Sequence, residues 1–195
     1  AGEIDRLVSL YDWEVTLAQY NLLSSHDEPR YLTMVNGDPS RLRLATLFQM
    51  TFPGPPSIYY GDEIGMEGGP DPDCRRAFRW DERSWHRSLR EDFKRFITLR
   101  KTHAALRRGD YRTLAATAET YALARSDEYE VVIAVFNVGS TPADVALDLS
   151  DLMPSDASLR QAWSEETVKV TNGRCSVRVP PLDAAVLIHR HRHTG

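Results

Sequence analysis

Two stretches of the sequence decide the fold: residues 20–27 read Tyr-Asn-Leu-Leu-Ser-Ser-His-Asp, and residues 56–63 read Pro-Ser-Ile-Tyr-Tyr-Gly-Asp-Glu. Each stretch contains a short apolar run, at residues 20–23 and 58–60, that ends in polar residues. A short apolar run bounded by turn-forming residues is typical of a buried strand. The two stretches therefore predict two strands, each with polar side chains at its C-terminal end.

The residues between these strands predict a helix. Asp38 suits the N-cap of that helix and Pro39 its first position, because a proline there loses no hydrogen bond. The helix is expected to stop at residues 53–56, which read Pro-Gly-Pro-Pro. The order along the chain is thus strand, helix, strand.

A further helix is predicted after a long loop at residues 61–83, which contains glycines and prolines but no sustained periodicity. Ser88 and Glu91 have capping-box spacing at its start, and Gly109 suits the C′ position at its end. We expect its buried stripe to face the two strand–helix units, and the stripe consists of Leu89, Phe93, Phe96 and Ile97.

From Tyr111 onward the pattern changes to short β-branched and aromatic runs separated by turn residues, which predicts antiparallel β structure. The change places a domain boundary near residue 109, with residues 1–109 in one domain and residues 110–195 in the other. The predicted strands cover residues 121–124, 131–136, 145–149, 177–179 and 185–188.

The predicted fold is α/β plus all-β. Strand, helix, strand, loop and helix, with polar residues after both strands, are typical of the last two units of a (β/α)8 TIM barrel, whose active site lies at that end. An antiparallel β-sandwich domain follows. Two units cannot close a barrel, so we expect further strands before residue 20, which would cover the edge at residues 20–23.

The composition excludes several classes of protein. The chain has 195 residues, of which 42% are hydrophobic and 27% charged, as in an ordinary soluble globular protein. A net charge of −4 argues against a nucleic-acid or membrane partner, because both require a basic face. Cys74 and Cys175 stand far apart without further metal ligands, so we interpret them as free thiols. This predicts a cytoplasmic protein without a metal or cofactor in this chain, and leaves secretion of the parent protein open.

Three motifs carry a resemblance to a known family. Residues 21–27 and 56–63 resemble the motifs at the ends of barrel strands seven and eight in the α-amylase family of glycoside hydrolases. Residues 69–76, which read Gly-Pro-Asp-Pro-Asp-Cys-Arg-Arg and lead to Trp80, are similar to the neopullulanase, cyclomaltodextrinase and maltogenic amylase branch. The motifs occur in the family's order, and the resemblance covers nearly the whole chain.

The resemblance implies roles for four residues. Asp27 matches the third conserved carboxylate, a catalytic residue that stabilises the distorted sugar in the transition state. His26 matches the histidine that binds the same sugar. Asp71 and Arg75 match an acid and an arginine that hold the next sugar toward the non-reducing end. Contacts that tighten as the sugar ring flattens lower the barrier, because they are stronger in the transition state than in the ground state.

Other interpretations stay open at this point. His26 and Asp27 could simply cap the loop after the strand. Trp80 is a candidate for stacking on a substrate sugar, although aromatic residues in such places are more often core. Asp62 and Glu63 are adjacent and so project differently, and we interpret them as structural.

The basic residues of the long loop also have two readings. Arg75, Arg76 and Arg79 could bind a phosphate group. Three acidic residues lie nearby, and they are Asp71, Asp73 and Asp81. Salt bridges to them that orient the loop are therefore favoured, and binding of an anion is not.

Nothing before Tyr20 resembles the family's nucleophile or general acid, and a retaining glycosidase needs both carboxyl groups about 5 to 5.5 Å apart. The chain alone is therefore expected to be inactive. The implied function of the parent protein is hydrolysis of α-1,4-glucosidic bonds in maltooligosaccharides, cyclodextrins or pullulan. The expected partners are an α-glucan oligosaccharide and the N-terminal part of the barrel, while calcium binding in that part and the oligomeric state stay open. The alternatives are a related transglycosylase or isomerase, or a non-enzymatic carbohydrate-binding fragment.

Overall fold

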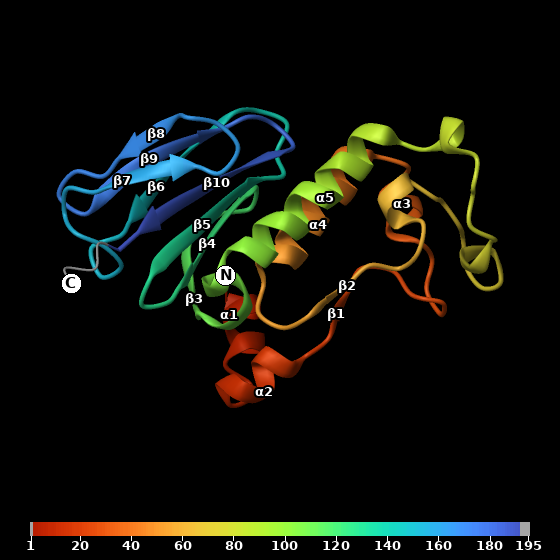
Figure 1. The fold of residues 1–195 in the computed structure, drawn as a ribbon, viewed down its shortest axis with the longest axis horizontal. Coiled ribbons are helices and arrows are strands. Elements are labelled where there is room, and N and C mark those ends of the chain that lie inside the picture. Colours follow the sequence, from red (N-terminus) through yellow and green to blue (C-terminus); the bar gives the residue numbers. More distant parts are fainter. Residues whose placement is uncertain (1, 192–195) are drawn as a thin grey trace.

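The computed structural model describes residues 2–191. Figure 1 shows α4 (Pro39–Thr51) and α5 (Arg87–Thr102) side by side across the middle of the molecule, with β-sheets on one side and long loops on the other. No helix within residues 2–191 is long and apolar enough to cross a membrane. The remaining helical segments are α1 (Gly2–Val8), α2 (Trp13–Ala18), α3 (Tyr31–Met34), α6 (Ala104–Arg108) and three short 3-10 helices at Asp62–Ile64, Asp73–Arg75 and Glu82–Ser84.

The predicted strand–helix–strand unit is present. β1 (Asn21–Leu22) pairs in parallel with β2 (Pro56–Ser57), and α4 forms the crossover between them. The side-chain amide of Gln49 on α4 donates to the carbonyl oxygens of Asn21, at 2.9 Å, and of Ser57, at 2.8 Å, and so ties both strands to the helix.

The second strand lies earlier than predicted. It begins at Pro56, and residues 58–60 are not part of it. The chain already turns at Tyr59, whose carbonyl oxygen accepts a hydrogen bond from the amide of Asp62 at 3.1 Å. Gly61 has a positive φ of 88° within this turn, a conformation that favours glycine.

The two long helices begin with different caps. The Asp38 carboxylate accepts a hydrogen bond from the amide of Ser40 at 2.9 Å, so the predicted N-cap of α4 is confirmed. The predicted capping box of α5 is wrong, because the N-cap is His86 and its ring nitrogen faces the amide of Leu89 at 3.3 Å. The Ser88 hydroxyl lies 3.3 Å from the same ring nitrogen instead of capping the helix.

Gly109 ends a different helix from the one predicted. α5 stops at Thr102, and α6 follows after the extended residue His103. Gly109 caps α6 with an ordinary φ of −72°, so it does not supply the left-handed conformation expected of a C′ glycine. A side chain at this position would clash with the carbonyl oxygens of Ser126 and Ala105, so the close approach of the chains requires the glycine here.

The C-terminal half forms two antiparallel sheets, which confirms the predicted β-sandwich. One sheet has six strands in the order β3-β4-β5-β10-β7-β8, and the other pairs β6 with β9. Every predicted run overlaps a strand, but β3, β7 and β8 lie outside the predicted runs, and β7 and β8 are short and mostly polar. The strands are β3 (Asp110–Ala116), β4 (Thr120–Ser126), β5 (Glu130–Asn137), β6 (Ala143–Asp148), β7 (Ser158–Gln161), β8 (Thr167–Lys169), β9 (Arg174–Val179) and β10 (Asp183–Arg190).

Each face of the six-stranded sheet contributes to a separate core. One face packs against the β6–β9 sheet through residues such as Ile133 and Leu147. The other face packs against the helices, where Phe96 of α5 meets Leu123 and Val186. The long β5 strand is buried along its entire length because both of its faces are covered.

The predicted stripe of α5 divides between two cores. Leu89 and Phe93 pack with Leu42 of α4, on the side of the two parallel strands. Phe96 is buried against the sheet, and Ile97 is only half-buried at the edge of the same core. The core around Phe96 also contains Leu44, Leu47 and Met50 of α4, so the stripe faces the strand–helix unit along its length and its second part faces the sheet as well.

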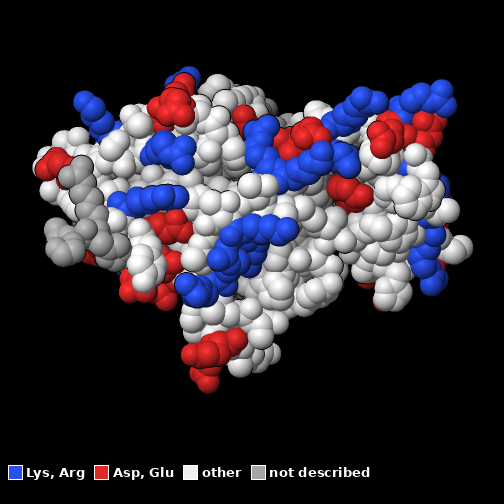
Figure 2. Space-filling view, viewed as in Figure 1, with Lys and Arg blue, Asp and Glu red and all other residues white. Residues whose placement is uncertain are grey.

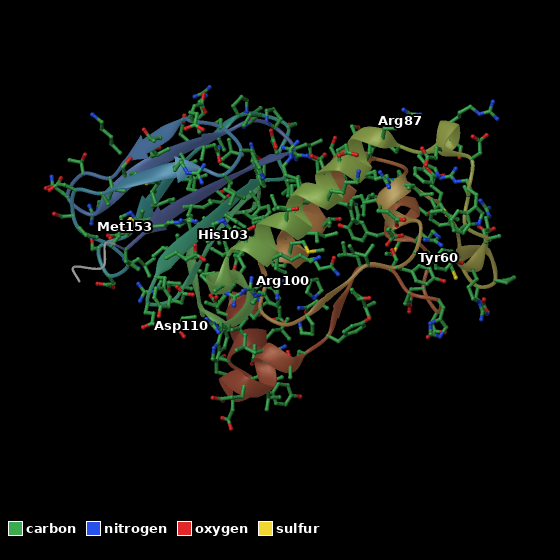
Figure 3. All side chains as sticks on the ribbon, viewed as in Figure 1. Tyr60, Arg87, Arg100, His103, Asp110 and Met153 are labelled. Atoms are coloured by element: carbon green, nitrogen blue, oxygen red, sulfur yellow. The ribbon has the colours of Figure 1, made fainter. Side chains whose placement is uncertain are left out.

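Two buried arginines, Arg100 and Arg125, occupy the junction of helices and sheet. Arg100 is labelled in Figure 3 on α5. Arg100 donates to carbonyl oxygens at and beyond the C-terminus of α4, those of Met50, Phe52 and Gly54, at 2.8, 3.1 and 2.6 Å. Arg125 on β4 donates to four further carbonyl oxygens, those of Thr51, Leu106, Gly109 and Asp110, at 2.8 to 3.1 Å. Burial lowers the pKa of Arg100 to about 10 and that of Arg125 to about 9, so both remain charged at neutral pH.

A third buried arginine joins the loops that follow β1 and β2. Arg30 donates to the carbonyl oxygen of Tyr60 at 2.8 Å and to the carboxylate of Asp62 at 3.0 Å. Its guanidinium also lies against the rings of Tyr59 and Tyr60, 4.6 and 4.8 Å from their centroids. Burial raises the pKa of Asp62 to about 6, against the opposing effects of Ser24 and Arg30.

We expect Arg125→Lys to lower the free energy of unfolding by about 3 kcal/mol, because an ammonium group cannot reach four carbonyl oxygens that a fork-shaped guanidinium satisfies. Urea unfolding measures this loss. The matched control is Arg112→Lys on the neighbouring strand, where the side chain is 50% exposed beside Asp151. The control should change stability by less than about 0.5 kcal/mol, and equal losses in both variants would contradict the assignment.

A second prediction concerns pH. The Asp62 carboxyl holds its proton to about pH 6 in the folded protein, but only to about pH 4 when unfolded. The folded state therefore binds more protons between these values, and the stability that this carboxyl contributes is lost as the pH rises through them. Relative to Asp62→Asn, the free energy of unfolding should fall by about 2 kcal/mol from pH 4 to pH 7. Parallel profiles for the two proteins in urea unfolding would show that this carboxyl has no raised pKa.

Candidate functional site

His26 and Asp27 lie on the loop that follows β1. Their side chains are 65% and 75% exposed, and His26 Nε2 lies 3.3 Å from Asp27 Oδ1. An exposed carboxylate next to an imidazole can accept hydrogen bonds from a ligand without first losing a buried partner. The loop thus displays both groups at the end of the strand.

The backbone of this loop is capped by two serines. Ser25 Oγ accepts a hydrogen bond from the amide of Asp27 at 3.1 Å, and Ser24 Oγ accepts from the amide of Tyr31 at 3.0 Å. In the described part of the chain neither His26 nor Asp27 bonds a backbone amide through its side chain. The structure therefore gives the capping role to the serines, and the interpretation of the His-Asp pair as a loop cap is wrong.

Asp71 and Arg75 form an ion pair on the loop that follows β2. Arg75 Nε lies 2.6 Å from Asp71 Oδ1, and both side chains are 48% exposed. The Asp71 carboxylate raises the pKa of Arg75, and the charge of Asp27 adds to this effect. Cys74, the residue before Arg75, lies with its sulfur 3.3 Å from the carbonyl oxygen of His26, so the structure brings the two predicted loops together.

A buried thiol connects the same two loops. Cys74 is fully buried, and its sulfur donates to the carbonyl oxygen of His26 at 3.3 Å. Gly68 makes room for it, because a Cβ at that position would lie 2.8 Å from the Cα of Cys74. Cys175 lies half-buried on β9 and is also unpaired, so both thiols are free, as predicted.

The basic residues of this loop are largely neutralised. Arg75 pairs with Asp71, and Arg76 pairs with Asp73, whose pKa is lowered by the Gly69 amide and by Arg76. Asp81 differs from the prediction, because it pairs with Arg83 and not with any of the three arginines, and Arg79 donates to the Gly65 carbonyl at 2.9 Å. In the upper right of Figure 2 basic and acidic residues are correspondingly interspersed, without a large area of one sign.

Trp80 lies apart from the other candidate residues. It is 82% exposed and packs edge-on against Phe78, with ring centroids 4.7 Å apart. Both rings line a hollow of about 450 Å³ with Trp85 and residues of α5, and none of His26, Asp27, Asp71 or Arg75 borders it. Trp80 thus has a free ring face, but the structure does not bring it to the Asp27 loop.

Three supporting residues were not predicted from the sequence: Arg30, Tyr60 and Cys74. A signal for Arg30 exists, since it is the only arginine or lysine between Tyr20 and Asp38 and the motif after β2 offers Asp62. Their contacts join residues about 30 to 50 positions apart, which local patterns do not reveal. Among residues 2–191, no three His, Cys, Asp or Glu side chains gather as a metal site would require.

Comparison with known proteins gives relatives that are named as enzymes of α-glucan breakdown. The chain is 45% identical over 164 residues to a cyclomaltodextrinase of Geobacillus thermopakistaniensis, covering 82% of this chain and 26% of the relative. It is 45% identical over 138 residues to neopullulanase 2 of Thermoactinomyces vulgaris, covering 70% of this chain and 24% of that protein. The chain therefore spans about a quarter of the length of these relatives.

Solved structures and a family model agree with these relatives. The debranching enzyme of Nostoc punctiforme, soaked with acarbose, superposes with a TM-score of 0.83 at 35% identity, over 95% of this chain and 37% of that one. Residues 9–105 match the family model for the α-amylase catalytic domain. That match contains both parallel strands and the loops that carry Asp27 and Arg75. The chain therefore belongs to the α-amylase family, with residues 9–105 forming part of the catalytic domain.

Proposed function

We propose that this chain is the C-terminal portion of a retaining glycosidase that cleaves α-1,4-glucosidic bonds in maltooligosaccharides, cyclodextrins or pullulan. The observation that carries the proposal is the contact between the loop of His26 and Asp27 and the loop of the Asp71–Arg75 pair, which follow two neighbouring parallel strands. Relatives named cyclomaltodextrinase and neopullulanase, which share 45% of the aligned residues, support this choice of substrates.

Asp27 serves the sugar at the cleavage point. Its exposed carboxylate accepts hydrogen bonds from ring hydroxyls, and these bonds shorten as positive charge develops at the anomeric carbon. His26 binds a hydroxyl of the same sugar. The Asp71–Arg75 pair offers both an acceptor and forked donors to the next sugar, which fixes the orientation of the chain.

The nucleophile and the general acid come from another part of the protein. A double displacement needs one carboxylate to attack the anomeric carbon and a second carboxyl to protonate the leaving oxygen. Asp71 is engaged by Arg75 and Asp62 is buried beside Arg30, so neither can take these roles. The chain alone is therefore inactive in this proposal.

An N-terminal barrel portion is the partner that supplies those carboxyl groups. The N-terminal segment of the chain exposes large apolar side chains, including Leu10 at 52%, Tyr11 at 54% and Val15 at 48%. The two-stranded parallel sheet is likewise short of neighbours, and parallel strands are normally covered on both faces. In this arrangement residues 1–109 complete the barrel and residues 110–195 form the β domain. The two free thiols fit a cytoplasmic protein.

Asp27→Asn in the whole protein should lower kcat about 100- to 1,000-fold, because a preorganised charge for the transition state is lost. KM should change little. Steady-state kinetics on maltooligosaccharides measure both constants. Glu28→Gln is the matched control, since it removes an adjacent exposed charge. An unchanged kcat with a raised KM in Asp27→Asn would contradict the proposed role.

Arg75→Ala should lower kcat/KM about tenfold to a hundredfold for substrates that fill the second sugar site, because hydrogen bonds from a charged donor are lost. Substrates too short to reach that site should be affected little. The matched control is Arg83→Ala, which also removes an arginine from a loop ion pair but is 88% exposed. An equal loss at every substrate length would instead place Arg75 in loop folding.

A further inference from the structure

We propose that Tyr60 is a positioning residue that sets the location of the Asp71–Arg75 pair relative to Asp27. The inference rests on the proposed function and adds the group that couples the two sugar-binding loops. Tyr60 is labelled in Figure 3 near the loops that follow β1 and β2, and the residue is 39% exposed.

The ring of Tyr60 is held in place by Arg30. The Arg30 side chain is fully buried, and within residues 2–191 its Nε and Nη2 have no hydrogen-bond acceptor. Burying a cation with unsatisfied donors is costly, so its contacts with Asp62 and with the two tyrosine rings must offset that cost. If the Tyr60 ring moved away, Arg30 would lose one of the contacts that offset the cost of burying its charge.

Arg30 is also anchored to the Asp27 loop by its position in the chain. It follows Asp27 by three residues, and its own amide donates to the carbonyl oxygen of Gly68 at 2.9 Å. The backbone of Arg30 thus joins the first loop to the start of the second. Its guanidinium donates a hydrogen bond to the Tyr60 carbonyl oxygen at 2.8 Å and so fixes the backbone of the motif at residues 56–63.

The hydroxyl of Tyr60 completes the connection. It donates to the carbonyl oxygen of Arg76 at 2.8 Å, one residue from Arg75. A ring fixed by Arg30 therefore holds the backbone that presents the Arg75 guanidinium. Tyr60 acts on the substrate only through Arg75, and this distinguishes positioning from direct binding.

A double-mutant cycle in the whole protein tests the proposal. Tyr60→Phe keeps the ring and removes the hydrogen bond, so kcat/KM for long maltooligosaccharides should fall about two- to tenfold when Arg75 is present. In the Arg75→Ala background the same substitution should change kcat/KM less than about twofold, because the group that it positions is gone. Equal losses in both backgrounds would overturn the proposal, because they would show an effect independent of Arg75.

Tyr31→Phe is the matched control. Tyr31 is adjacent to Arg30 and partly buried against the Leu32 and Leu42 core, and among the described residues its hydroxyl makes no bond to the 68–77 loop. It should change kcat/KM less than about twofold in both backgrounds. A Tyr31→Phe effect as large as that of Tyr60→Phe would also overturn the proposal.

Amide hydrogen exchange separates this inference from the proposed function. The amides of residues 68–77 should exchange faster in Tyr60→Phe than in the wild type, and should be unchanged in Tyr31→Phe. If the whole protein cleaves no α-glucan, the proposed function fails, and the exchange rates alone decide whether Tyr60 orders the loop. Unchanged exchange in Tyr60→Phe would overturn the inference whatever the activity.

Discussion

The contact between the helices and the sheet depends on satisfying carbonyl oxygens that the helices leave without partners. The last carbonyls of a helix have no partner within it, and α4 and α6 both end where the sheet excludes water. Arg100 and Arg125 together donate to seven carbonyl oxygens, some in the last turns of these helices and the others just beyond their ends. The apolar core around Phe96 can form only because these polar groups are not left unpaired.

A buried guanidinium has a similar function beneath the candidate site. Arg30 connects the loop after β1 to the loop after β2 through Asp62, a carbonyl oxygen and two aromatic rings. Neither strand is long enough to align the loops by itself, because each contributes only two residues to the pairing. The geometry of the site is therefore set mainly by side chains below it.

The site separates buried support from exposed recognition. Arg30 is fully buried, whereas Asp27 and the Asp71–Arg75 pair are about half or more exposed. Exposed charges stay hydrated until a ligand displaces the water, and their surface ion pair contributes little to stability. Arg30 and its buried contacts hold the exposed groups in position and leave them accessible to a ligand. Binding and catalysis require this kind of preorganisation.

The sequence by itself determined the order of strand, helix and strand, the Asp38 cap, the antiparallel β half and the residues that match the family's motifs. These features are local, since they depend on periodicity, on capping chemistry and on the spacing of residues along the chain. Only the tertiary structure decided that His86 and not Ser88 begins α5, that Gly109 serves close packing, and that Trp80 lies away from Asp27. It also decided the contacts of Arg30, Tyr60 and Cys74 with residues far along the chain, because such partners are selected by burial and packing, which no local pattern encodes.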